Sequence, residues 1–236
     1  YRPGYPPEVI EFLREECGLT RDSVVADIAS GTGLWTLRLL ENGNPVFGVE
    51  PNEEMRKAGE QYLAEFPRFT SIGGTAEATT LPDHSVDMIT TAQAAHWFDR
   101  VRARREFMRI LKPAGWTVLL WNERLTDSTP FLRAYEKLLL DYGTDYKEVR
   151  HERTIDEIRD FFAPSPYKEK TFDSAQRFDY EGLEGRLLSS SYTPQAGHPK
   201  YAPMLKRLRA IFDDHQVNGN VDVAYDTKIF YGVLEP

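Results

Sequence analysis

The stretch Asp27-Ile28-Ala29-Ser30-Gly31-Thr32-Gly33 (DIASGTG) decides the fold. It follows the apolar pair Val24-Val25 and precedes a second apolar run that begins at Leu34. A buried strand that breaks at a glycine-rich turn and continues as a helix commonly holds a ligand at that turn. The ligand must suit two glycines in the turn and an acid directly before it.

The composition bounds the class of protein. The chain has 236 residues, 41% hydrophobic and 28% charged, which is enough for one substantial core. Its formal net charge of −8 argues against nucleic acid as the main partner. No apolar run reaches the roughly 18 residues of a membrane span, and no signal peptide is visible. We expect a cytoplasmic protein that does not bind membranes; its oligomeric state is left open.

The cysteine count also fits a cytoplasmic protein. Cys17 is the single cysteine, which excludes a disulfide framework and a cysteine-based zinc site, and no metal is expected. The sequence opens on Tyr1 instead of Met, so we expect native residues to precede it.

Strands and helices alternate over the first half of the chain. The patterns predict strands at 23–28, 45–50, 69–73, 86–91 and 116–121, and helices at 6–17, 35–42, 52–66 and 98–111. Such alternation indicates an α/β fold with a doubly wound, largely parallel sheet. In the helix at 52–66 the spacing predicts that Met55, Ala58, Tyr62 and Phe66 face inward. In the helix at 98–111 it predicts a buried stripe of Val101, Met108 and Leu111 beside solvated arginines.

After residue 121 the pattern changes. Helices are predicted at 131–142, 154–162, 180–190 and 201–215, and strands at 168–178 and 221–234. We expect a single domain, in which residues 1–121 form the ligand-binding core with a lid segment at 1–6. Residues 122–236 would add the last two strands and a helical cover over the carboxyl ends of the sheet, where such folds bind ligands.

Two ligands compete for the glycine turn, a dinucleotide and S-adenosylmethionine. A dinucleotide fingerprint needs a small residue where this sequence has Thr36, and a carboxylate at Asp27 would repel a pyrophosphate. S-adenosylmethionine carries an ammonium and a sulfonium, which an acid attracts. Glu50, at the end of the second strand, can accept hydrogen bonds from both ribose hydroxyls. The residues therefore favour the methyl donor, and a tight turn without a ligand is the third possibility.

Residues 27–33 resemble the D/E-x-G-x-G-x-G signature of class I S-adenosylmethionine-dependent methyltransferases, with Ala29 in place of the first glycine. Further matches follow in order at 48–55 (GVEPNEEM), 74–77 (GTAE), 93–98 (QAAHWF) and 111–115 (LKPAG). The stretch at 93–98 and the opening residues 1–6 (YRPGYP) resemble the branch that contains trans-aconitate methyltransferase. The resemblance implies a Rossmann-like, seven-stranded mixed sheet with an antiparallel final strand.

The resemblance also implies a cofactor site. Its residues would be Asp27, Ala29, Gly31, Gly33, Glu50, Pro51, Met55, Ala76, Glu77 and Gln93. Backbone at the two glycines would approach the methionine moiety, Pro51 and Met55 would flank the adenine, and Gln93 would lie beside the sulfonium. On spacing alone Met55 fits a core position better than an adenine contact, and Glu77 could be an acid of a solvated loop.

The acceptor side is less defined. The opening residues Tyr1, Arg2 and Tyr5 suit a segment that folds over a ligand, although a frayed terminus is the plain alternative. His96 and Trp97 follow the fourth strand, where the acceptor lies in this fold; His96 is the candidate general base or a hydrogen-bonding wall residue. Tyr192 is a candidate wall residue of the acceptor pocket or the end of a helix.

The predicted function is methyl transfer to a small-molecule acceptor, with a carboxylate preferred. An amine or phenol with His96 as base is the first alternative. A protein that binds S-adenosylmethionine without turnover is the second. A nucleic-acid methyltransferase is disfavoured, because no Asn-Pro-Pro-Tyr or Asp-Pro-Pro-Tyr sequence follows the fourth strand and the net charge is negative.

Overall fold

The computed structural model describes residues 3–144, 146, 158 and 160–235. The chain forms two compact units. Unit 1 comprises residues 1–3, 123–153 and 173–226, and unit 2 comprises residues 4–122, 154–172 and 227–236. The boundary at 122/123 falls one residue from the end of the predicted cofactor-binding core. Whether the chain is functionally one domain stays a prediction.

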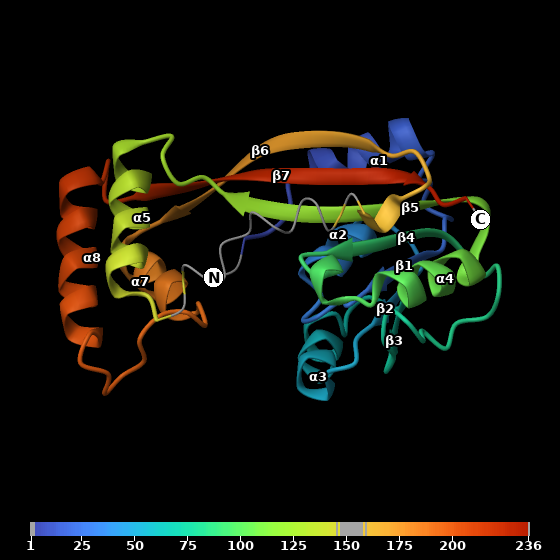
Figure 1. The fold of residues 1–236 in the computed structure, drawn as a ribbon, viewed down its shortest axis with the longest axis horizontal. Coiled ribbons are helices and arrows are strands. Elements are labelled where there is room, and N and C mark those ends of the chain that lie inside the picture. Colours follow the sequence, from blue (N-terminus) through green and yellow to red (C-terminus); the bar gives the residue numbers. More distant parts are fainter. Residues whose placement is uncertain (1–2, 145, 147–157, 159, 236) are drawn as a thin grey trace. The chain divides into compact units, whose positions relative to one another are not determined.

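A seven-stranded sheet has the order β3-β2-β1-β4-β5-β7-β6 (Figure 1). Its strands are β1 Val25–Ile28, β2 Val46–Val49, β3 Phe69–Ile72, β4 Val86–Ala92, β5 Leu111–Arg124, β6 Lys168–Phe178 and β7 Val221–Val233. The pairs of β1 with β2 and β4, of β2 with β3, and of β4 with β5 are parallel, whereas β7 is antiparallel. In β1, Asp27 pairs with Gly48 of β2 and Thr90 of β4. The strand ends that hold the predicted ligand therefore lie side by side.

In unit 2, helices pack on both faces of the sheet. These helices are α1 Glu8–Cys17, α2 Leu34–Glu41, α3 Glu53–Tyr62, the 3-10 helix η1 Ala95–Trp97 and α4 Arg100–Ile110. Helices α1 and α2 bury Leu13 and Leu39 in one core cluster, and α4 buries Phe107 and Ile110 in another. Strands β1 and β4 contribute to both clusters, because successive side chains of a strand point to opposite faces.

Unit 1 has a core of its own, formed by α5 Pro130–Tyr142, α7 Tyr180–Leu188 and α8 Tyr201–His215 with parts of the long strands. Leu132, Leu183 and Leu208, one from each helix, are fully buried there. The apolar face of each helix is thus covered within the unit. None of the helices in the described residues is long and apolar enough to cross a membrane.

The predicted fold class is confirmed, but two helix faces were assigned wrongly. In α3, Met55, Ala58 and Tyr62 are exposed and Phe66 is half-buried, while Gly59 and Leu63 are buried. This helix packs through a glycine, which an apolar-residue pattern does not reveal.

In α4, Val101 is 72% exposed, so it does not belong to the predicted buried stripe. Met108 packs half-buried against the core, and Leu111, directly after the helix, is buried, as predicted. The helix also buries Ala103, Glu106, Phe107 and Ile110. The predicted start at residue 98 was also early, because Asp99 caps the helix by accepting a hydrogen bond from the Arg102 N–H. Of the helix predicted at 154–162, residues 158 and 160–162 are helical and the rest lies outside the described residues.

Candidate functional site

The glycine turn between β1 and α2 needs backbone conformations that side chains disfavour. Gly31 and Gly33 have φ values of 58° and 88°, and Ala29 has a φ of 58° as well. Gly33 is the N-terminal cap of α2. A β-carbon on Gly33 would lie 2.7 Å from Cδ1 of Leu63, so a side chain there would collide with the residue that follows α3. The turn is closely packed, and a side chain at Gly33 would meet both a positive φ and this contact.

Asp27 is the next-to-last residue of β1, two residues before Ala29 of this turn, and is 1% exposed. Its carboxylate accepts hydrogen bonds from Thr36 Oγ1 at 2.6 Å and from Thr90 Oγ1 at 3.2 Å. Burial raises the pKa of Asp27 to about 7; the two hydroxyl hydrogen bonds act in the opposite direction, and the nearby Glu50 adds to the rise. From the sequence, Thr36 was considered only as a residue that does not fit a dinucleotide fingerprint. A buried acid needs hydrogen-bond partners, however, and a nearby hydroxyl such as that of Thr36 is the partner to expect.

Glu50 follows β2 and joins two segments of backbone. Its side chain accepts hydrogen bonds from the Gly31 N–H at 2.9 Å and from the Asn52 N–H at 2.8 Å. The residue is 5% exposed. Glu50 therefore links the glycine turn to the start of α3, in addition to the ribose contact predicted for it.

The two carboxylates share an uncommon property. Among the described residues, neither Asp27 nor Glu50 forms an ion pair with a lysine, arginine or histidine side chain. Arg56 approaches Glu50 only at its backbone carbonyl oxygen, at 3.1 Å. Buried acids without a basic partner favour a positively charged ligand and disfavour a pyrophosphate. The residues therefore fit the ammonium and sulfonium of S-adenosylmethionine.

Of the residues predicted around the adenine, Met55 lies beside this turn. Met55 is 39% exposed, and its methyl carbon lies 3.2 Å from where a β-carbon of Gly31 would be. An exposed Met55 against the turn does not fit the core alternative. Pro51 is exposed and Ala76 is buried. Glu77 accepts a hydrogen bond from the Asp99 N–H at 2.9 Å, which ties its loop to the start of α4.

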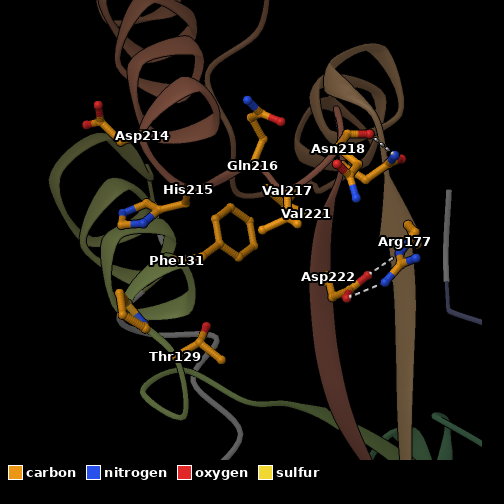
Figure 2. A pocket seen from close by; sticks show the side chains of 12 residues that line it. Thr129, Phe131, Arg177, Asp214, His215, Gln216, Val217, Asn218, Val221 and Asp222 are labelled. Carbon is orange, nitrogen blue, oxygen red and sulfur yellow. Dashed lines mark hydrogen bonds and ion pairs between the residues drawn. The ribbon is translucent and has the colours of Figure 1, made fainter.

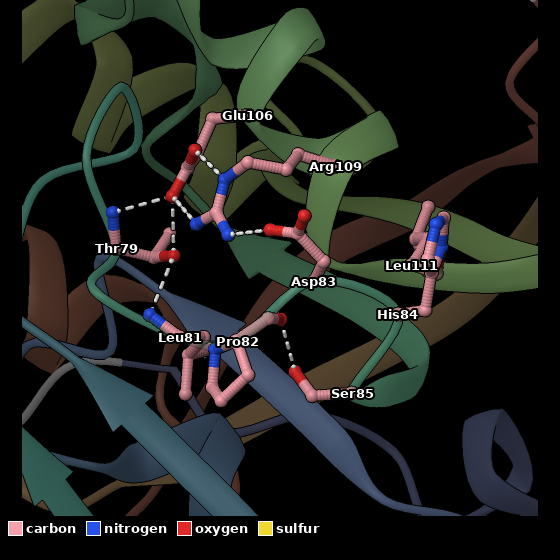
Figure 3. Close-up of polar contacts among 9 residues, drawn as sticks. All are labelled: Thr79, Leu81, Pro82, Asp83, His84, Ser85, Glu106, Arg109 and Leu111. Carbon is pink, nitrogen blue, oxygen red and sulfur yellow. Dashed lines mark hydrogen bonds and ion pairs between the residues drawn. The ribbon is translucent and has the colours of Figure 1, made fainter.

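A polar cluster that the sequence did not suggest supports the same loop (Figure 3). Glu106 of α4 accepts hydrogen bonds from both the N–H and the hydroxyl of Thr79, at 2.8 and 2.6 Å. Arg109 donates to the same carboxylate and to Asp83. The hydrogen bond from Arg109 is the main cause that lowers the pKa of Glu106 to about 2. Arg109 is thus a paired residue, not part of a freely solvated basic face.

Gln93 lies where β4 ends, in a left-handed conformation with a φ of 62°. Its side-chain amide donates to the carbonyl of Asn122 at 3.0 Å. Asn122 in turn donates to the Gly4 carbonyl at 3.1 Å and accepts from the Thr227 hydroxyl at 2.6 Å. This network connects β4, β5, β7 and the segment before α1. Asn122 was missed in the sequence because an asparagine within an apolar strand carries no motif.

His96 and Trp97 belong to η1. The His96 ring centroid lies 4.6 Å from that of Trp97, and the ring meets Trp121 edge-on at 5.3 Å. Trp121 is buried, whereas Trp97 is 80% exposed. The imidazole is therefore held between two indoles at the carboxyl end of β4, the place predicted for the acceptor.

The other residues predicted to contact the acceptor are found in different places. Tyr1 and Arg2 lie outside the described residues. Tyr5 is 6% exposed, and its ring packs edge-on against Trp35 at 5.2 Å, so its ring is part of the core of unit 2. Tyr192 belongs to unit 1, where its ring lies 4.9 Å from that of Tyr146.

Unit 1 also contains a cavity of about 540 Å³ next to the start of α5 and the end of α8 (Figure 2). Its lining includes Phe131, His215 and the ion pair of Arg177 with Asp222. None of the predicted site residues lines it.

Comparison with known proteins agrees with this geometry. Residues 26–119 match the family model described as a methyltransferase domain. An uncharacterized methyltransferase of Mycobacterium tuberculosis is 37% identical over 93% of this chain and 84% of its own. One from Schizosaccharomyces pombe is 29% identical over 96% and 92% of the two chains. The solved structure of a putative type II methyltransferase from Anaeromyxobacter dehalogenans has the same fold, with a TM-score of 0.73 and 23% identity over 100% of this chain and 99% of that chain.

The chain belongs to the S-adenosylmethionine-dependent methyltransferases. S-adenosylmethionine is accordingly its cofactor, and the predicted dinucleotide alternative is set aside. The alternative of a binding protein without turnover is set aside with it.

Proposed function

We propose that the protein transfers the methyl group of S-adenosylmethionine to the carboxylate of a small molecule. One observation supports placing the cofactor at these residues: Asp27 and Glu50 are both buried, and neither has a basic partner among the described residues. The negative net charge favours a small-molecule acceptor over nucleic acid, and the preference for a carboxylate rests on the resemblance of residues 93–98 to the trans-aconitate branch. Both the acceptor and that branch are part of the proposal.

When bound, the cofactor supplies a methyl group on a positively charged sulfur, already activated for displacement. The protein must then hold the acceptor in line and exclude water. In the proposal Glu50 holds the ribose, the turn at Gly31 and Gly33 approaches the methionine moiety, and Gln93 lies near the sulfur. These residues bind and orient, so none of them needs to move a proton.

The need for a base separates the acceptor classes. A carboxylate, with a reference pKa of about 4, is ionised at neutral pH and needs no base. A phenol or alcohol must lose its proton, and His96 is the best-placed base. With a carboxylate acceptor, His96 would donate a hydrogen bond to it, and Trp97 would form part of the wall.

Substitution of His96 by glutamine separates the two readings once turnover is found in a panel of small carboxylic acids and phenols. A carboxylate acceptor predicts a kcat within about tenfold of the wild type and a raised KM. A phenol with His96 as base predicts a fall in kcat of about 10²–10⁴-fold. His84→Asn is the matched control, because His84 precedes β4 at its opposite end and asparagine tolerates its left-handed conformation. A collapse of kcat with KM unchanged would overturn the carboxylate proposal.

A further inference from the structure

The segment that follows β3 packs against the end of the neighbouring strand β2, within unit 2. The N–H of Glu50 donates to the carbonyl of Ile72, the last residue of β3, at 3.0 Å. A β-carbon on Gly74 would lie 3.1 Å from Cγ1 of Val49 and 3.0 Å from the carbonyl oxygen of Ala78. The segment that begins at Gly74 therefore lies against the residue before Glu50, which is the predicted ribose ligand.

Residues 75–78 form a tight turn with an unpaired peptide at its tip. Thr75 and Ala78 each donate a backbone hydrogen bond to the carbonyl of the other, both at 3.2 Å. Among the described residues, the N–H and carbonyl groups of Ala76 and Glu77 have no hydrogen-bond partner. Ala76 is 5% exposed, and a residue so buried rarely leaves its backbone groups unpaired. An N–H donor next to a carbonyl acceptor complements the N1 acceptor and the 6-amino donor of adenine.

Glu106 of α4 holds the residue that directly follows the 75–78 turn (Figure 3). Its Oε1 accepts hydrogen bonds from the Thr79 N–H at 2.8 Å and from the Thr79 hydroxyl at 2.6 Å. Nη2 of Arg109 donates to the same oxygen at 2.7 Å, and Nε of Arg109 donates to Oε2 at 2.8 Å. Thr79 is fully buried, and the Glu106 side chain is 10% exposed. The buried carboxylate, itself fixed by Arg109, therefore determines where Thr79 lies.

A second contact joins the 75–78 turn to the same helix. The Asp99 N–H donates to the Glu77 carboxylate at 2.9 Å, and Asp99 is the N-terminal cap of α4. The turn is thus connected to α4 at two points, through Glu77 at its tip and through Thr79 after it. Because α4 is anchored in the core by Phe107 and Ile110, it gives the turn a fixed support.

We propose that Glu106 is a positioning residue of the cofactor site, which through Thr79 orients the 75–78 turn so that its tip hydrogen-bonds to the 6-amino edge of adenine. This inference rests on the cofactor placement in the proposed function. Glu106 does not touch the cofactor and acts only through Thr79. It would determine which purine the protein accepts. Hypoxanthine, with a donor at N1 and an acceptor at position 6, presents the reversed pattern and should be rejected.

The ratio of two affinities tests this role on the whole protein. Calorimetry measures the binding of S-adenosylhomocysteine and of S-inosylhomocysteine, which carry a 6-amino and a 6-oxo purine and are otherwise alike. The wild type should bind S-adenosylhomocysteine about tenfold more tightly or better, because the 6-oxo purine mismatches both backbone groups. In Glu106→Gln this ratio should fall by about threefold or more, because an amide offers one acceptor oxygen where the carboxylate uses two.

Two threonine variants separate positioning from a general structural role. Thr79→Val removes the hydroxyl but keeps the shape and the N–H, and it should also lower the ratio by about threefold or more. Thr79→Ser keeps the hydroxyl and should have the ratio of the wild type. Glu65→Gln and Thr70→Val change exposed residues of the same unit and should leave the ratio unaltered. Thermal unfolding of each variant shows that it is folded before the ratios are compared.

An unchanged ratio in Glu106→Gln and Thr79→Val would overturn the inference, because a merely structural loss weakens both ligands alike. A wild type that binds the two ligands equally would overturn it as well. If S-adenosylhomocysteine fails to bind the wild type, the cofactor placement is wrong and the inference fails with it. Binding with an unchanged ratio refutes the positioning role alone, so the two failures are distinct.

Discussion

At position 50 one carboxylate serves two purposes. Glu50 accepts hydrogen bonds from the Gly31 and Asn52 N–H groups, and it is the predicted acceptor for the ribose hydroxyls. Glu50→Ala should weaken binding of S-adenosylhomocysteine by about 1.5–3 kcal/mol, because the two ribose hydroxyls of the ligand lose their charged hydrogen-bond acceptor. Calorimetry measures this.

A matched variant for that experiment is Glu60→Ala, which removes an exposed acid from the neighbouring α3. It should leave the affinity unchanged. An unaltered affinity in Glu50→Ala would show that the ligand does not contact this carboxylate.

Ala29 is an alanine in a conformation that suits glycine. Its φ of 58° lies in the left-handed region, which costs a residue with a β-carbon about 1–2 kcal/mol. Glycine avoids that cost but loses more backbone entropy on folding, by about 0.5–1 kcal/mol. Ala29→Gly should therefore raise the free energy of unfolding by up to about 1 kcal/mol, measured by urea denaturation. Ala26→Gly, at a buried and extended position of β1, should instead destabilise the protein; equal losses in both variants would refute the argument.

Among the elements, α3 is the one whose packing depends on a missing side chain. A β-carbon at Gly59 would lie 3.2 Å from the carbonyl oxygen of Gly31, so the helix rests directly on the glycine turn. Gly59→Ala improves helix propensity by about 1 kcal/mol. Its methyl group would, however, crowd the backbone of the glycine turn at Gly31, which cannot move aside as a side chain can. It should therefore lower the affinity for S-adenosylhomocysteine more than it changes stability.

The neighbouring position provides the control. Ala58 is exposed on the same helix, so Ala58→Gly should cost about 1 kcal/mol of stability and leave the affinity as it was. Calorimetry and thermal unfolding of the two variants compare the effects. If Gly59→Ala binds S-adenosylhomocysteine as the wild type does, α3 does not position the turn.

The same helix shows what the sequence could and could not predict. The order of strands and helices follows from apolar periodicity, and β6 and α8 have their predicted bounds. The acids at 27 and 50 could be found because each ends a buried strand before a turn. The inward face of α3 could not be predicted, because Gly59 contributes no apolar signal and Met55 faces the turn.

Partners from distant parts of the chain were also beyond prediction. Thr79 meets Glu106, and Gln93 meets Asn122, only once the strands are placed side by side.

For the whole molecule, the buried acid Asp27 makes stability depend on pH. Its pKa is about 7 in the folded protein and about 3.9 in an unfolded chain, so between these values the folded state binds more protons. Its contribution is therefore most favourable below about pH 4 and is progressively lost as the pH rises toward about 7. The groups that face it are the hydroxyls of Thr36 and Thr90 and the carboxylate of Glu50.

Asp27→Asn isolates this contribution, because asparagine keeps the shape and has no proton to lose. The free energy of unfolding of the wild type minus that of Asp27→Asn should fall steadily from about pH 5 to pH 7 and become level above about pH 8. Urea denaturation at half-unit steps of pH, in buffers of equal ionic strength, measures the difference. Other titrating groups are common to both proteins and cancel, which makes the difference specific to position 27. A difference that is constant across this range, or that grows with pH, would mean that Asp27 is ionised in the folded protein and that a cation compensates its charge.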